Sequence, residues 1–178
     1  TKLRAAVLRR ACRWQSAPLP PEEERRLRAL HALGILDTEP EERFDRYTKQ
    51  AAEALDVPIV LVSMVDADRQ WFKSRHGFDV QETPRDQSLC AHAILGSDVF
   101  QIPDLLEDPR FADSPATNME GRVRFYAGVP LVVSDGSRVG SLCVVDHRPR
   151  TLNDTQLDTL RGLAALVEAE LEATRSTT

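Results

Sequence analysis

The sequence predicts an α+β fold, with a central antiparallel sheet of five to six strands, terminal helices on one face and loops over the other. Two observations support this prediction. Apolar residues recur at helical spacing near both ends of the chain, while short apolar runs separated by turn residues occupy the middle. Because few residues separate the paired runs, hairpins predominate over parallel crossovers, and neighbouring strands are expected to be antiparallel.

The length and composition are typical of one globular domain without a transmembrane segment. The chain has 178 residues, 42% apolar and 29% charged, and its longest apolar run, 57–65, is too short to cross a bilayer. The net charge of -5 argues against nucleic-acid binding. Cys12, Cys90 and Cys143 are widely spaced and follow no apolar signal-like stretch, so we expect a cytoplasmic protein. Because the sequence begins at Thr1, we expect either a processed protein or a piece of a longer one.

Residues 1–20 are predicted to form a basic amphipathic helix followed by a proline-rich linker. Such a helix either lies on an anionic membrane or a partner, or is an extension packed loosely on the domain. The main domain is then expected over 21–174, with a short tail at 175–178.

Two helices are predicted to open the main domain. The first spans about 21–33, because a proline and three glutamates suit its N-terminus and Gly34 suits its C-terminal cap. Thr38 and Glu41 have the spacing of a capping box for the second helix, at about 39–55. Its apolar residues recur every three or four positions, so it should bury one face.

The first hairpin is predicted from a buried, β-branched run at 57–65 and an alternating run at 70–75. A short helix over about 88–95 should follow, with Asp86 or Ser88 as its cap.

The second half of the sheet is predicted from a short strand at 99–102 and a second hairpin made by 123–133 and 138–145. Between them, 103–121 is a long irregular segment of the kind that often serves as a lid.

The last helix is predicted over 154–172, with Asn153 and Gln156 at its start. Its apolar residues form two stripes rather than one, so we expect one stripe to pack on the domain and the other on a partner helix. The alternative is that both stripes are covered within one chain, with helix 21–33 packed on helix 154–172. The stripes comprise Leu157, Leu160, Leu163, Ala164, Leu166, Val167 and Leu171.

Six segments, in this order, resemble the GAF family, in the branch often found ahead of diguanylate cyclases and sensor histidine kinases. They cover residues 25 to about 170 and read RLRALHALGILDTEPEERFDRYTKQAA, VPIVLVSMVDADRQWFKSRHG, ETPRDQSLCAHAIL, DPRFADSP, RFYAGVPL and GSLCVVD. The resemblance implies a PAS-like fold and a small-molecule sensor in signal transduction, joined to an effector domain such as a cyclase or a kinase. Leu89, Ser114 and the stretch 118–122 depart from the family pattern, which bears on the ligand preference.

The resemblance places a ligand pocket between the sheet and the loops. Its walls are expected to combine aromatic residues with a few orienting polar groups: Phe72, Cys90, His92, Ile102, Asp104, Phe111, Phe125 and Tyr126. Cys90 and His92 point about 200° apart on a helix, which argues against a shared metal or catalytic dyad. Either Cys90 is core and His92 a pocket wall, or both contact the ligand. Asp104, Asp108 and Arg110 either orient a polar ligand or close the loop by hydrogen bonds.

Other members of the GAF fold suggest cofactors and an enzymatic alternative. Bilin attachment needs a Cys followed directly by His, and Ala91 intervenes here. Haem would need His76, His92 or His147, although a solitary His is more often structural. Recognisable cyclic-nucleotide signatures are absent, and the residues identify no cofactor. A free methionine sulfoxide reductase would need a resolving thiol for Cys90.

No resolving thiol is predicted, because Cys143 lies in an apolar strand and Cys12 lies outside the domain. The sequence also has no phosphate loop, HExxH, GxSxG or CxxC motif, so no catalytic residue is expected. We therefore expect a regulatory binding module rather than an enzyme, and a homodimer joined through 21–33 and 154–172. The alternatives are the thiol-dependent reductase and a dimerisation module whose pocket is filled.

Overall fold

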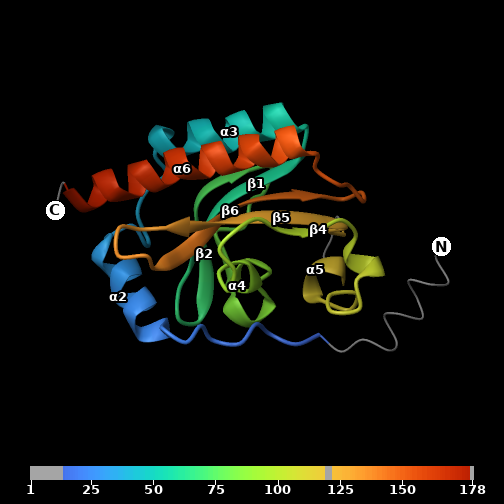
Figure 1. The fold of residues 1–178 in the computed structure, drawn as a ribbon, viewed down its shortest axis with the longest axis horizontal. Coiled ribbons are helices and arrows are strands. Elements are labelled where there is room, and N and C mark those ends of the chain that lie inside the picture. The colour runs from blue at the N-terminus through green and yellow to red at the C-terminus, as the bar shows by residue number, and fades with distance from the viewer. Residues whose placement is uncertain (1–13, 119–121, 177–178) are drawn as a thin grey trace.

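A computed structural model describes residues 14–118 and 122–176 (Figure 1). The predicted basic helix at the N-terminus lies outside these residues, apart from Trp14 at its end. Among the helices in the described ranges, none combines the length and the apolar character needed to cross a membrane.

The core of the fold is a six-stranded sheet of order β3-β2-β1-β6-β5-β4, in which each neighbouring pair is antiparallel. The α+β prediction is thereby confirmed. The strands are β1 (Ile59–Val65), β2 (Arg69–His76), β3 (Glu82–Pro84), β4 (Phe100–Ile102), β5 (Phe125–Val132) and β6 (Arg138–Asp146). Only β3 was not expected. It is a polar three-residue segment that pairs with β2 at the sheet edge, and it has no periodic pattern of its own.

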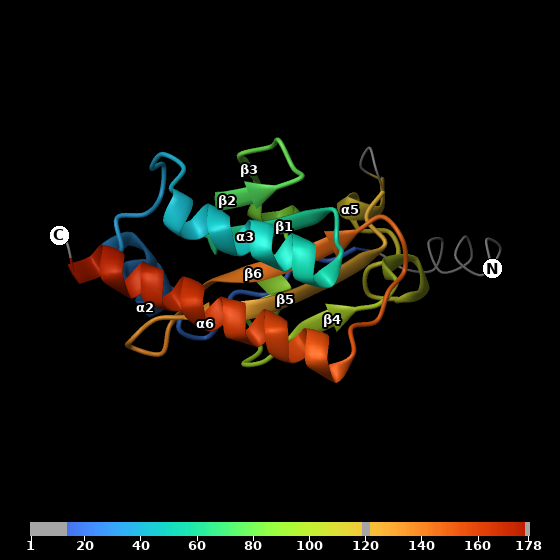
Figure 2. The same cartoon turned by 90° about the horizontal axis from the view of Figure 1, so that it is seen from above.

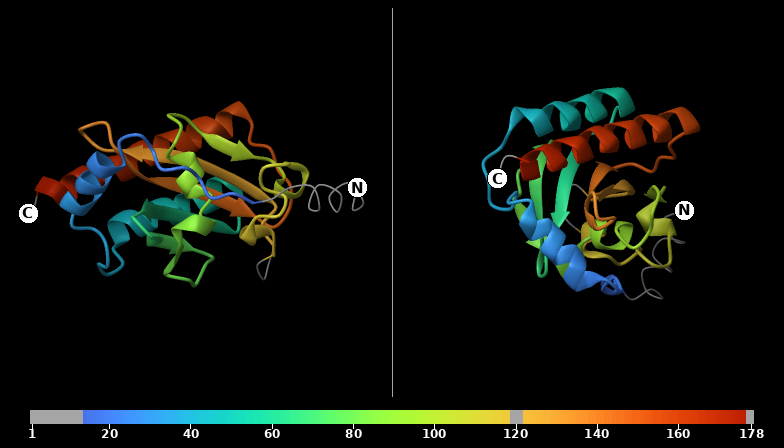
Figure 3. Two further views of the ribbon diagram at one scale, coloured as in Figure 1. Left: turned by 90° about the horizontal axis from the view of Figure 1, so that it is seen from below. Right: turned by 60° about the vertical axis from the view of Figure 1, so that its left-hand side comes forward.

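Long helices cover one face of the sheet and short elements cover the other. Figure 2 shows α3 (Glu42–Leu55) and α6 (Asp154–Ser176) side by side over the first face, and Figure 3 shows α2 (Glu23–Ala32) at one end of the sheet. The second face carries α4 (Cys90–Ala93), α5 (Pro115–Asn118) and two 3₁₀ turns, η1 (Arg85–Gln87) and η2 (Leu105–Glu107). The long irregular segment expected after β4 thus contains η2 and α5.

The three long helices overlap their predicted ranges, although α3 begins at Glu42 rather than at about 39 and α6 continues to Ser176 rather than ending at 172. Only one of the two predicted capping boxes forms. Asn153 and Gln156 exchange two hydrogen bonds, from Gln156 N to Asn153 Oδ1 at 2.8 Å and from Asn153 N to Gln156 Oε1 at 2.9 Å. The box predicted from Thr38 and Glu41 is wrong. Both side chains contact Lys73 Nζ, at 2.8 Å and 2.7 Å, because this ammonium is buried and requires acceptors and a negative charge.

Alternation along the central strands builds two separate cores. Toward the long helices, β1, β5 and β6 present residues such as Val60, Phe125 and Leu142, which pack with α3 and α6. Toward the short elements, the same strands present Leu61 and Cys143, among others, in a second cluster. A single set of strands therefore supports both faces.

The first apolar stripe of α6 packs within its own chain, whereas the second is divided between the buried Leu163 and the exposed Leu166. Leu160, Leu163, Ala164, Val167 and Leu171 are all buried in the helix-side core. They are buried because α6 lies in the angle between the sheet and α3 and therefore contacts two surfaces at once. Leu166 is the large apolar residue of this helix that stays exposed.

Candidate functional site

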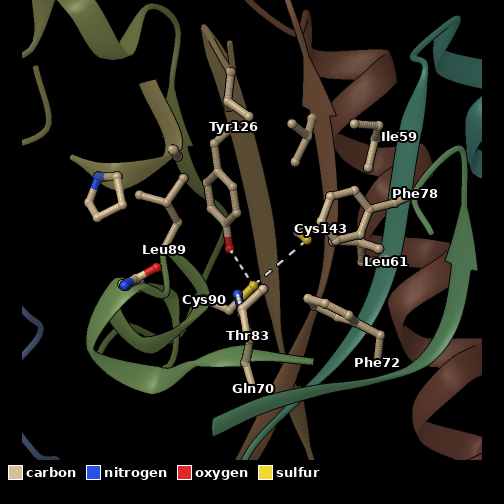
Figure 4. Close-up of a pocket in the computed structure, with 15 residues that line it drawn as sticks. Ile59, Leu61, Gln70, Phe72, Phe78, Thr83, Leu89, Cys90, Tyr126 and Cys143 are labelled. Carbon is tan, nitrogen blue, oxygen red and sulfur yellow. Dashed lines mark hydrogen bonds between the residues drawn. The ribbon is translucent and has the colours of Figure 1, made fainter. Parts of the chain in front are cut away.

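A cavity of about 190 Å³ lies between the sheet and the short elements of the second face (Figure 4). Its sheet side is formed by apolar residues of β1, β2 and β6, and its opposite side by α4 and α5. Side chains that line it include Ile59, Leu61, Phe72, Leu89, Ala116 and Val145. Among the described residues that line the cavity, none is an acidic residue, a lysine, an arginine or a histidine. The lining therefore suits an uncharged or weakly polar molecule.

One side of the cavity carries polar groups near the surface. Gln70 Oε1 accepts hydrogen bonds from Ser63 Oγ at 3.1 Å and Ser88 Oγ at 2.7 Å, while its Nε2 donates to Thr83 Oγ1 at 2.7 Å. These bonds hold the amide in one orientation. Gln87, which is exposed, also lines the cavity, so the site reaches the surface at this side. A ligand with one polar end can therefore direct that end toward Thr83 and Gln87.

The inner end of the cavity holds two thiols and a phenol. The Cys90 and Cys143 sulfurs are 3.7 Å apart, and Tyr126 donates from its hydroxyl to Cys90 Sγ at 3.2 Å (Figure 4). Tyr126 can take this position because Gly128, two residues along β5, has no side chain. A Cβ atom on Gly128 would lie 2.3 Å from the Tyr126 oxygen.

This cluster shifts the acidity of its members in opposite directions. The hydrogen bond with Cys143 lowers the pKa of Cys90, burial opposes this, and the nearby hydroxyls of Ser141 and Tyr126 lower it further. The contact with Cys90 and burial raise the pKa of Cys143. Burial raises the pKa of Tyr126, so its hydroxyl remains protonated and available as a donor. The first proton to leave the pair is therefore that of Cys90.

Of the residues predicted for the pocket, Phe72, Cys90 and Tyr126 line this cavity. Ile102 belongs to the same buried cluster without lining the cavity. Phe125 does not reach the site. It neighbours Tyr126 on β5 and therefore points to the opposite face, into the core beneath the long helices.

His92 and Phe111 lie in an adjacent aromatic cluster instead. The His92 ring is 5.4 Å from that of Trp14 and 5.0 Å from that of Phe111, and the Phe100 ring is 5.9 Å from that of Phe111. Burial lowers the pKa of His92. The cluster joins the segment before α2 to α4 and to the loop after β4. Because Cys90 and His92 are two residues apart on one helical turn, they serve two different sites.

Asp104 closes a loop rather than orienting a ligand in this cavity. Its carboxylate accepts two hydrogen bonds from the Arg124 guanidinium, at 2.9 Å and 2.8 Å, and one from Leu106 N at 3.1 Å. Asp108 likewise binds the Arg110 side chain, at 3.0 Å and 2.8 Å. Loop closure, the alternative weighed for these residues, is the geometry observed.

Sequence reasoning missed Cys143 and Gly128. The expectation that Cys90 has no nearby thiol is wrong, because β6 brings Cys143 beside α4 across 53 residues of sequence. The alternation of side chains along the strands relates these residues to the cavity. Tyr126 and Gly128 lie on the same face of β5, and Gly128 is paired with Cys143 of β6. That register is a property of the folded sheet rather than of either segment.

Metal and haem sites find little support in this geometry. His76, His92 and His147 do not line the cavity. Within the described part of the chain, no group of three or more His, Cys, Asp or Glu residues is placed to hold a metal ion.

Comparisons with known proteins agree with this fold. A family comparison matches the GAF domain over residues 39–171. A cyclic di-GMP phosphodiesterase of Pseudomonas aeruginosa is 42% identical over 161 residues, which are 90% of this chain and 27% of that protein. The chain thus spans about a quarter of that relative's length.

Solved structures give the same result for the fold. The GAF domain of a phosphoenolpyruvate-protein phosphotransferase from Coxiella burnetii superposes with a TM-score of 0.65 at 14% identity, covering 85% of this chain and 95% of that one. A free methionine-R-sulfoxide reductase from Neisseria meningitidis superposes with a TM-score of 0.59 at 20% identity, covering 94% and 99%. At these identities the likeness concerns the fold alone. With the family match over most of its length, the chain belongs to the GAF domain family.

Proposed function

We propose that this GAF domain is a cytoplasmic regulatory sensor that binds a small, weakly polar molecule in the cavity between its sheet and α4. The observation that carries the proposal is the cavity itself, which has an apolar lining and a polar side that reaches the surface. This combination is typical of ligand sites, in which apolar walls provide affinity and a few polar groups fix orientation. The alternative of a filled pocket fits less well, because side chains leave about 190 Å³ open.

The volume of the cavity suits a small molecule. An apolar cavity of about 150 Å³ is large enough for benzene. A cavity of about 190 Å³ therefore suits a compound of similar or slightly larger size. Haem, bilins and cyclic di-nucleotides are several times larger, and the last also carry charges that no described lining residue neutralises.

Strands β5 and β6 connect the cavity to α6 and can therefore transmit ligand occupancy to this helix. Each strand alternates cavity residues with residues that pack beneath the long helices, so a shift on one face moves the other. In addition, Glu168 Oε1 accepts from Val132 N at 3.0 Å, which joins α6 to the end of β5. We expect ligand occupancy to change the packing of α6, and α6 to transmit this change to an effector domain.

The effector is expected to be a cyclic di-GMP enzyme, a cyclase or a kinase in a longer protein. The similarity to the Pseudomonas aeruginosa phosphodiesterase favours cyclic di-GMP turnover. A homodimer through residues 21–33 and 154–172 remains part of the proposal, in which it supplies the helix pairs that the signal moves. The apolar surface that α6 offers to a second copy is small, since Leu166 is its main exposed apolar residue.

Thermal unfolding in the presence of phenol and indole tests ligand binding. Both probes are small enough for the cavity and carry one polar group, so they should raise the unfolding midpoint in a concentration-dependent way. Ala116→Leu places a larger side chain in the cavity and should abolish this rise. Ala54→Leu makes the same change on the exposed side of α3 and should retain it. If neither probe stabilises the wild-type chain, or if Ala116→Leu responds equally, binding in this cavity is contradicted.

A second candidate function is a thiol-dependent methionine sulfoxide reductase, and the Cys90–Cys143 distance of 3.7 Å is the observation that favours it. In that reaction the sulfoxide oxygen leaves as water while two thiols become a disulfide. Free methionine sulfoxide carries two charges, however, and the described lining offers no partner for them. Turnover of free methionine sulfoxide with a thiol donor, abolished by Cys90→Ser, would make the enzyme the better account.

A further inference from the structure

The thiol pair at the inner end of the cavity has no structural role that requires two cysteines. Cys90 lies at the start of α4 and Cys143 in the middle of β6, and both are buried. Their sulfurs are 3.7 Å apart, whereas a disulfide requires about 2 Å. The two sulfurs are therefore in van der Waals contact but not bonded.

The surroundings favour reaction of Cys90 before Cys143. Tyr126 Oη donates to Cys90 Sγ at 3.2 Å, and the donor position is set by the missing side chain at Gly128. A protonated hydroxyl aimed at a sulfur stabilises the thiolate, which is the form that attacks electrophiles. Cys143 then lies within reach of the modified sulfur. Both residues line a cavity that opens beside Gln87, so a small reagent has a path to them.

We propose that Cys90 and Cys143 form a redox modification site, at which a small hydroperoxide entering the cavity converts the two thiols into a disulfide. The Cys90 thiolate attacks one peroxide oxygen, the O–O bond breaks, and Cys90 becomes a sulfenic acid while hydroxide leaves and is protonated to water. The Cys143 sulfur then attacks the Cys90 sulfur, the S–O bond breaks, and the thiol proton leaves with the hydroxyl as a second water. Two thiols are oxidised and one hydrogen peroxide is reduced.

The disulfide would change the cavity as well as the cysteines. It connects α4, on one side of the cavity, to β6, on the other, and so fixes the short helix against the sheet. It also removes the Cys90 thiolate, which is the form of the sulfur that accepts the Tyr126 hydrogen bond most strongly. The proposal does not depend on which ligand the cavity binds, and it holds for a sensor and for a reductase alike.

The test uses the full chain with Cys12→Ser. Any intramolecular disulfide in this variant must then join Cys90 to Cys143. After treatment with hydrogen peroxide under native conditions, we expect a mass loss of two hydrogens and a linked peptide that contains Cys90 and Cys143. Dithiothreitol should restore the original mass. Tyr126→Phe removes the hydroxyl but keeps the ring, and it should slow disulfide formation by about threefold or more.

Cys143→Ser and Cys90→Ser serve as matched controls, since each replaces a thiol by a hydroxyl of similar size. With Cys143→Ser, peroxide should add oxygen to Cys90 instead of removing two hydrogens. With Cys90→Ser, Cys143 should react more slowly than Cys90 does. Circular dichroism confirms that each variant is folded before the comparison. The proposal is overturned if the folded Cys12→Ser chain keeps two free thiols, or if Cys90 is oxidised to a sulfinic acid while Cys143 stays reduced.

Discussion

The two faces of the sheet use the same strands for different purposes. On the helix-covered face, side chains such as Phe125, Leu142 and Leu160 are fully buried in a continuous apolar core. On the loop-covered face, the alternate residues line a cavity, and ion pairs such as Glu23–Arg85 and Asp104–Arg124 hold the surrounding segments. Apolar packing provides stability on the first face. The second face gives up part of that packing for an open site.

The largest expected effect comes from truncating a leucine on each face. Leu142→Ala, beneath the long helices, should lower the free energy of unfolding by about 3 to 5 kcal/mol, because it opens a void in a filled core. Leu61→Ala borders the existing cavity, loses fewer contacts and should cost about 1 to 3 kcal/mol. Urea unfolding of both variants measures the difference. Equal costs would remove the contrast between the two faces.

A second prediction concerns the ion pairs around the cavity side. Burial raises the pKa of Glu23, but hydrogen bonds from Arg26 and Arg85 outweigh it and lower the pKa to about 2. Since this pKa lies below the unfolded value of 4.5, the carboxylate stabilises the fold at neutral pH. That stability is present above pH 4.5 and is lost as the pH falls through 2.

Glu23→Gln should therefore cost about 2 to 3 kcal/mol at pH 7 and much less at pH 2.5. Glu22→Gln is the control, because Glu22 is exposed and pairs with the exposed Arg25. Denaturant midpoints at the two pH values provide the measurement. A cost for Glu23→Gln that does not change with pH would show that the charge of this carboxylate is unimportant.

Two glycine substitutions, one on the cavity face and one in α6, are expected to have smaller effects of opposite sign. Gly128→Ala should destabilise by about 1 to 3 kcal/mol, since its new Cβ meets the Tyr126 oxygen. Gly162→Ala lies in α6 with no atom within 4 Å of the new Cβ, and it should stabilise by about 0.5 to 1 kcal/mol through helix propensity. If Gly128→Ala does not lower the unfolding midpoint, the close approach of Tyr126 to Gly128 is not a real constraint.

The smallest effect on stability is expected for Leu166→Glu. This side chain is 46% exposed, so the change should alter the free energy of unfolding by no more than about 0.5 kcal/mol. Sedimentation equilibrium should nevertheless show weaker self-association than in the wild-type chain. A wild-type chain that is monomeric at high micromolar concentration would contradict the dimer.

The sequence was most informative where periodicity is strong. The long helices and the two hairpins follow directly from the spacing of apolar residues, and the Asn153–Gln156 capping box was correctly predicted. Local rules failed where distant residues compete. The Thr38 and Glu41 side chains bind the Lys73 ammonium instead of capping α3. Strand register, which no single segment encodes, brings Cys143 beside Cys90 and turns Phe125 away from the cavity.

Methyl NMR during a phenol titration tests whether the ligand binds in this cavity, because it reports on both faces of the sheet in one experiment. We expect the largest shifts for methyl groups of Ile59, Leu61 and Val145, which line the cavity, and smaller shifts, transmitted through β6, for Leu142 and Val144 on the opposite face. Ala116→Leu should suppress the shifts, and Ala54→Leu should not. No shift at the cavity methyls, or equal shifts on both faces, would contradict the assignment of ligand binding to this cavity.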